Sequence, residues 1–60
     1  MYLKLKREER KMLIKSKRTS NGLIEVREAS TAGWYALYVN GHLKEQSASL
    51  DYILREYDRL

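Results

Sequence analysis

The dipeptide Asn40-Gly41 lies between two runs of strand-forming residues and constrains the fold more than any other feature of the chain. Both central residues of a type I′ turn need positive φ, which Asn and Gly adopt at little cost, so the sequence predicts a β-hairpin here. A two-residue loop also sets which residues face each other across the hairpin. The predicted pairs are Val39 with His42, Tyr38 with Leu43, Leu37 with Lys44, and Tyr35 with Gln46.

A helix is predicted directly after the hairpin, over residues 49–59, because apolar residues recur there at helical spacing. Ser49 is a suitable N-cap, and Asp51 lies in the first turn, where a negative charge favours the positive end of the helix dipole. The apolar stripe consists of Leu50, Ile53, Leu54, Tyr57 and Leu60. This stripe should pack on a sheet, with Tyr57 in the core.

Residues 34–39 are apolar on both faces, which favours a central strand, whereas 42–47 alternates less cleanly and is typical of an edge. An earlier strand, 23–29, reaches the other side of the central strand through a turn at 30–33. With that loop, one face of the sheet holds Ile24, Val26, Leu37 and Val39 and takes the helix stripe. The opposite face holds Trp34, Ala36, Tyr38 and Leu43 beside Glu25, Arg27 and Glu45.

The N-terminal third supports two interpretations. A second turn at Asn21-Gly22 predicts a strand near 12–19, with Arg18 opposite Glu25 and Lys15 opposite Glu28. Residues 5–17 are also rich in helix formers, so a basic helix is the alternative. We favour the strand. The fold class is therefore α+β: a small antiparallel sheet of three to four strands, packed by one C-terminal helix, with segment 4–18 either strand or helix.

The charge of the chain is uneven. The 60 residues allow one domain, 1–60, and its net charge is +4. Residues 1–18 carry eight basic and two acidic groups, which is +6, and residues 19–60 carry four basic and six acidic groups, which is −2. The basic residues of the N-terminal segment 1–18 are Lys4, Lys6, Arg7, Arg10, Lys11, Lys15, Lys17 and Arg18.

Catalytic and cofactor chemistry find little support in the composition. There is no Cys and a single His, His42, beside a tight turn, and one imidazole makes neither a metal site nor a catalytic triad. The three glycines are spaced singly and form no phosphate-binding loop. We expect no enzyme activity, no cofactor and no metal. The longest apolar run, 34–39, is far too short to span a membrane, and we expect a cytoplasmic protein.

Two functions remain. Lys and Arg attract phosphates, and exposed aromatic rings stack on bases, so the first is nucleic-acid binding, with DNA favoured over RNA, by the basic segment with Arg27, Trp34 and Tyr38. The second is a protein-binding adaptor or inhibitor, for example one encoded by a phage or mobile element, that uses the Trp34/Tyr38 face or a strand edge. An exposed edge at 42–47 would also allow a homodimer.

The order of a hairpin followed by a helix is loosely similar to the small DNA-binding domains, three strands and a helix, at the N-termini of some tyrosine recombinases. The similarity lies in topology and involves no motif. It implies DNA binding.

Overall fold

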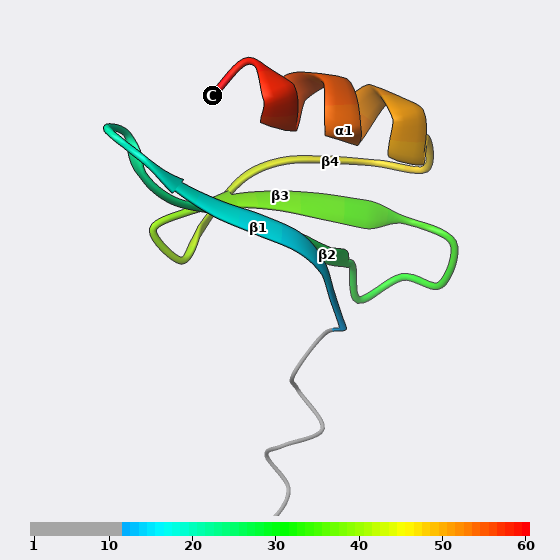
Figure 1. The fold of residues 1–60 in the computed structure, drawn as a ribbon. Coiled ribbons are helices and arrows are strands. Elements are labelled where there is room, and N and C mark those ends of the chain that lie inside the picture. Colours follow the sequence, from blue (N-terminus) through cyan, green and yellow to red (C-terminus); the bar gives the residue numbers. More distant parts are fainter. Residues whose placement is uncertain (1–11) are drawn as a thin grey trace, which may run out of the picture.

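A computed structural model of the chain describes residues 12–60. Within them, four strands form one antiparallel sheet in the order β1-β2-β3-β4, and a single helix lies on one side of it (Figure 1). The elements are β1 (Leu13–Thr19), β2 (Gly22–Glu28), β3 (Tyr35–Val39), β4 (His42–Ser47) and α1 (Leu50–Asp58). The predicted α+β class, the central strand and the C-terminal helix are confirmed. Outside the described residues lie Lys4, Lys6, Arg7, Arg10 and Lys11.

The core lies between the sheet and α1. Alternation along β2 and β3 directs five side chains to the helix side, where they meet Ile53 and Tyr57. Ser49 caps the helix as predicted, since its side chain accepts a hydrogen bond from the backbone N–H of Tyr52. The sheet side of the core consists of Ile24, Val26 and Leu37, which are fully buried, with Val39 and Tyr35 packed beside them.

The hairpin between β3 and β4 has the predicted turn, with φ of 53° at Asn40 and 86° at Gly41. The first two predicted pairs, Val39 with His42 and Tyr38 with Leu43, are confirmed. The next two are wrong, because a β-bulge leaves Lys44 without a partner and shifts the rest of β4 by one residue. The observed pairs are Leu37 with Glu45, Ala36 with Gln46, and Tyr35 with Ser47.

The predicted strand near 12–19 is confirmed as β1. The alternative, a basic helix over residues 5–17, is therefore wrong for residues 13–17, which lie in β1. Its register differs from the prediction, because Thr19 pairs with Gly22 and the loop is Ser20-Asn21. The predicted charge pairs, Arg18 with Glu25 and Lys15 with Glu28, are therefore not cross-strand partners. The observed partners are Leu23 for Arg18, Val26 for Lys15, and Ser16 for Glu25.

Position 22, the first residue of β2, needs a glycine because the Asn40 side chain of the other hairpin lies against it. The side chain of Asn40 accepts a hydrogen bond from the backbone N–H of Leu23 at 2.9 Å and donates one to the carbonyl of Asn21 at 3.3 Å. A Cβ at Gly22 would overlap this side chain, and Gly22 has a φ of 116°. The two turns are thus tied together by the Asn40 amide, which sets the position of the β1–β2 loop.

No helix among residues 12–60 is both long enough and apolar enough to cross a membrane.

Candidate binding surface

The face of the sheet opposite α1 is left uncovered by the described residues (Figure 1). Residues that pair across an antiparallel sheet share a face, so the register defines its members. Two rows run across it: Leu13, Arg27, Ala36 and Gln46, then Ser16, Glu25, Tyr38 and Leu43. Arg18 and Leu23 follow on one side, and Trp34 on the other. We call this surface the open face.

Trp34 and Tyr38 are the aromatic residues of the open face, as predicted. Trp34 is 41% exposed, and Tyr38 is half-buried. Trp34 precedes β3, but the ladder continues to it, because the backbone N–H of Ala29 donates to its carbonyl at 3.0 Å. Neither aromatic side chain lies under α1, so the predicted division of the sheet into a covered and an aromatic face holds.

Ala36 lies between the two aromatics and is only 1% exposed, although no element covers it. Its nearest neighbours on the open face are Trp34 and Tyr38 along the strand and Arg27 and Gln46 across the sheet. We call these four side chains the platform.

Arg27 is oriented within the platform by an ion pair. Its guanidinium lies 2.7 Å from a carboxylate oxygen of Glu25, two residues earlier on the same face. Both side chains are largely covered, at 28% and 15% exposed. The pair restrains the direction of the planar guanidinium on this face. Because Glu25 offsets its charge, Arg27 adds little net charge to the face.

The basic residues of β1 are divided between the two sides of the sheet. Arg18 lies on the open face. The ammonium groups of Lys15 and Lys17 lie on the helix side, over the Tyr57 ring at 5.2 and 4.5 Å from its centre. Each such contact contributes about 0.5–1 kcal/mol where water reaches it. The described part of the basic segment therefore presents cations along an edge strand, not on one face.

Glu45 was expected on the open face and lies instead on the helix side, where its carboxylate accepts a hydrogen bond from the Tyr52 hydroxyl. The cause is the bulge at Lys44, which shifts every later residue of β4 to the other side of the sheet. Gln46 takes its place on the open face. The bond to Glu45 also raises the pKa of the Tyr52 phenol, with smaller contributions from burial and from the carboxylate charges nearby.

Exposed aliphatic residues extend the open face beyond the aromatics. Leu43, which the hairpin register predicted here, is 52% exposed. Leu13 is 45% exposed and lies opposite Arg27, a position that sequence reasoning missed. A correct register for β1 would have placed it, but the Asn21-Gly22 motif indicated the wrong loop. Each outer strand thus adds one exposed leucine to the open face.

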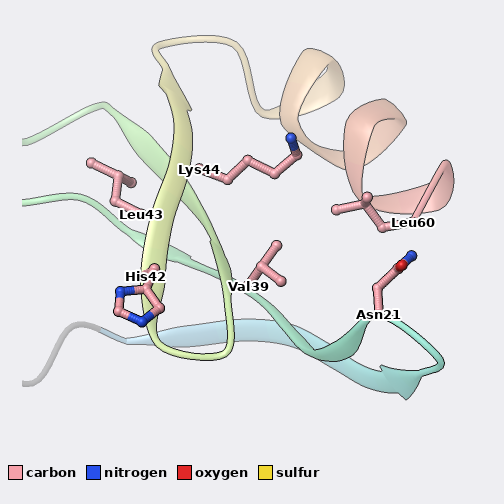
Figure 2. A pocket seen from close by; sticks show the side chains of 6 residues that line it. All are labelled: Asn21, Val39, His42, Leu43, Lys44 and Leu60. Atoms are coloured by element: carbon pink, nitrogen blue, oxygen red, sulfur yellow. The ribbon is translucent and has the colours of Figure 1, made fainter.

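A hollow of about 460 Å³ lies on the helix side, near the Asn40-Gly41 turn (Figure 2). It is lined by Asn21, Val39, His42, Leu43, Lys44 and Leu60. In Figure 2, Lys44 extends toward the helix while Leu43 points to the other side of β4, which agrees with its place on the open face. None of these six residues has a carboxylic acid side chain.

Both outer strands carry features that discourage pairing with another chain. A bulge interrupts β1 between Leu13 and Lys15, and another interrupts β4 at Lys44. Bulges and lysines are the devices by which edge strands avoid sheet extension. Dimerisation through 42–47 stays a prediction, and this geometry disfavours it.

Comparisons with known proteins give no relative for this chain: no family model matches it, and neither do any curated protein or any solved structure.

Proposed function

We propose that this chain is a non-enzymatic nucleic-acid-binding domain that uses the open face together with the basic N-terminal segment, with DNA as the favoured ligand. The observation that carries the proposal is the exposure of Trp34 on an uncovered sheet face, beside Arg27 and with Arg18 on the same face. Aromatic rings with Arg on an open sheet suit contacts to bases and sugars. The cytoplasm is the compartment that we propose.

The distribution of charge supports the same function. Residues 12–60 carry seven basic and six acidic groups, a net charge of +1, whereas residues 1–11 carry five basic and two acidic groups, a net charge of +3. Most of the attraction for phosphates would therefore come from the first eleven residues and from β1, which follows them. The open face would supply the shorter-range contacts.

A salt titration tests this function. The full chain is titrated with labelled DNA at about 50 and 200 mM salt, and the neutralisation of four phosphates should weaken binding roughly 50- to 150-fold between the two. Replacing Lys4, Lys6 and Arg7 together by Gln should lower the slope by about one unit for each phosphate that these residues neutralise. Absence of binding to DNA and RNA at low salt would refute the proposal.

The apolar edges of the open face favour one alternative, a protein-binding adaptor or inhibitor. Leu13 and Leu43 are both about half exposed on the same face as Trp34, and Trp, Tyr and Arg are the residue types that dominate protein interfaces. This alternative predicts that Trp34→Ala weakens binding to a protein target far more than the triple Gln variant does, with a shallow dependence on salt. The two functions thus differ in which variant matters.

A further inference from the structure

We infer that the ligand of the open face is single-stranded nucleic acid, whose bases stack on the platform of Trp34, Tyr38, Arg27 and Gln46. This inference rests on the proposed function and narrows it to one ligand class. Base faces are free to stack on protein rings only when the bases are out of a duplex. The platform places Trp34, which is exposed, and Tyr38 on the same uncovered face as Arg27.

The dimensions of the sheet argue against a duplex on this face. The major groove of B-DNA is about 12 Å wide and admits a helix or a two-stranded ribbon. Four strands at about 4.8 Å spacing place the outer two about 14 Å apart before side chains are added. Arg27 and Tyr38 of the platform lie on the two central strands, β2 and β3, and not on a projecting edge. A flexible single strand can lie across such a surface.

The helix provides no alternative surface for a duplex. α1 uses its apolar stripe to cover the core, so its outer side is what remains for a ligand. Asp51 and Asp58 are exposed there, and α1 carries three carboxylates against one guanidinium, Arg55. Phosphates would be repelled from this side. Charge therefore favours β1, whose cations lie on both sides of the sheet, over the outer side of the helix.

The β1 edge and the open face would make different contacts with the ligand. Arg18 lies on β1, one edge of the sheet, and residues 1–11 precede that strand in the sequence. Phosphates would be neutralised along this edge, and bases would lie over β3, two strands away, which is about 10 Å. Gln46 adds an amide that can bond to base edges. Binding should combine a salt-dependent part with a part that depends on the bases.

The fluorescence of Trp34 provides a direct test, because it is the only tryptophan of the chain. The full chain is titrated at one low salt concentration with an oligothymidylate, a duplex of equal length and an abasic strand of equal length. We expect the oligothymidylate to quench Trp34 and to bind at least about tenfold more tightly than the other two, since only it offers free base faces. Labelled oligonucleotides give the same affinities by anisotropy.

Variants separate stacking from folding. Trp34→Ala should weaken oligothymidylate binding about 5- to 140-fold, and Trp34→Phe should recover most of the loss because it keeps a ring. Tyr52→Ala is the matched control, since Tyr52 is 39% exposed but lies on the helix side. It should leave the affinity unchanged, and circular dichroism establishes that each variant is folded.

The outcomes distinguish the stacking inference from the proposed nucleic-acid binding on which it rests. If the abasic strand or the duplex binds as tightly as the oligothymidylate, or if Trp34 is not quenched, the stacking inference is overturned while nucleic-acid binding stands. If none of the three ligands binds at low salt, both are overturned, and a protein partner takes their place.

Discussion

Replacing Gly22 by Ala should destabilise the protein by about 2–4 kcal/mol, because two separate costs coincide at this position. The φ of 116° is unfavourable for a residue with a Cβ, which costs about 1–3 kcal/mol. The new methyl group would also displace the Asn40 side chain and break its two hydrogen bonds, at about 0.5 kcal/mol each for groups that water can reach. A domain of this size has only about 3–5 kcal/mol in total.

Gly33→Ala is the matched control. Gly33 also has positive φ, 85°, but no atom lies within 4 Å of the position that its Cβ would take. It should therefore cost only the backbone part, about 1–2 kcal/mol. A second control uses Asn40→Gly, which keeps the turn and removes the obstructing side chain. In that background Gly22→Ala should cost only its backbone part, about 1–3 kcal/mol.

The assay is urea unfolding followed by circular dichroism, with the free energies compared in a double-mutant cycle. We expect a coupling of about 1–2 kcal/mol between positions 22 and 40. The argument is wrong if Gly22→Ala costs no more than Gly33→Ala in the natural background, or if its cost is the same with and without the Asn40 side chain.

Four further predictions concern stability. Burial, with a smaller contribution from Asp58, raises the pKa of the Tyr57 phenol above its ordinary value of 10.0. The free energy of unfolding should therefore be unaffected below pH 10 and fall as the pH rises through the pKa of the folded state. If the phenol ionises at a lower pH than the one at which the circular dichroism changes, this prediction is wrong. Ile53→Ala should cost about 2–5 kcal/mol and leave no cooperative urea transition. Ser49→Ala should cost about 0.5–2 kcal/mol, measured as a lower urea midpoint, and an unchanged midpoint would exclude the cap. Lys17→Gln should cost less than about 1 kcal/mol, and a larger loss in the same assay would mean that this lysine does more than cover Tyr57.

The parts of the fold that sequence predicted correctly depend on local chemistry. Asn40-Gly41 is enough to predict its turn, and Ser49 with the apolar stripe is enough to predict the helix. Both structures depend on neighbours within a few residues. The division of β3 into two faces follows from strict alternation, which placed Trp34 and Tyr38 correctly on the open face.

The errors come from contacts and insertions that leave no local mark. An edge strand can accept an extra residue at little cost in free energy, so a bulge there needs no special residue type. The sequence near Lys44 therefore did not predict the bulge that moved Glu45 to the helix side. Gly22 looked like a turn residue, but its role depends on Asn40, which is far from it in sequence and adjacent in space. That same error hid the place of Leu13 on the open face.

The coverage of the sheet also has a dynamic consequence. α1 packs over β2, β3 and β4, whereas β1 has no buried residue and is held by its ladder to β2 and by two lysines over Tyr57. Its amide hydrogens should therefore exchange with solvent through local opening, at a lower free energy than global unfolding. Three basic residues, Lys15, Lys17 and Arg18, lie on this strand. A ligand that bridges this strand and the open face would close the opening, so slowed exchange in β1 would report binding.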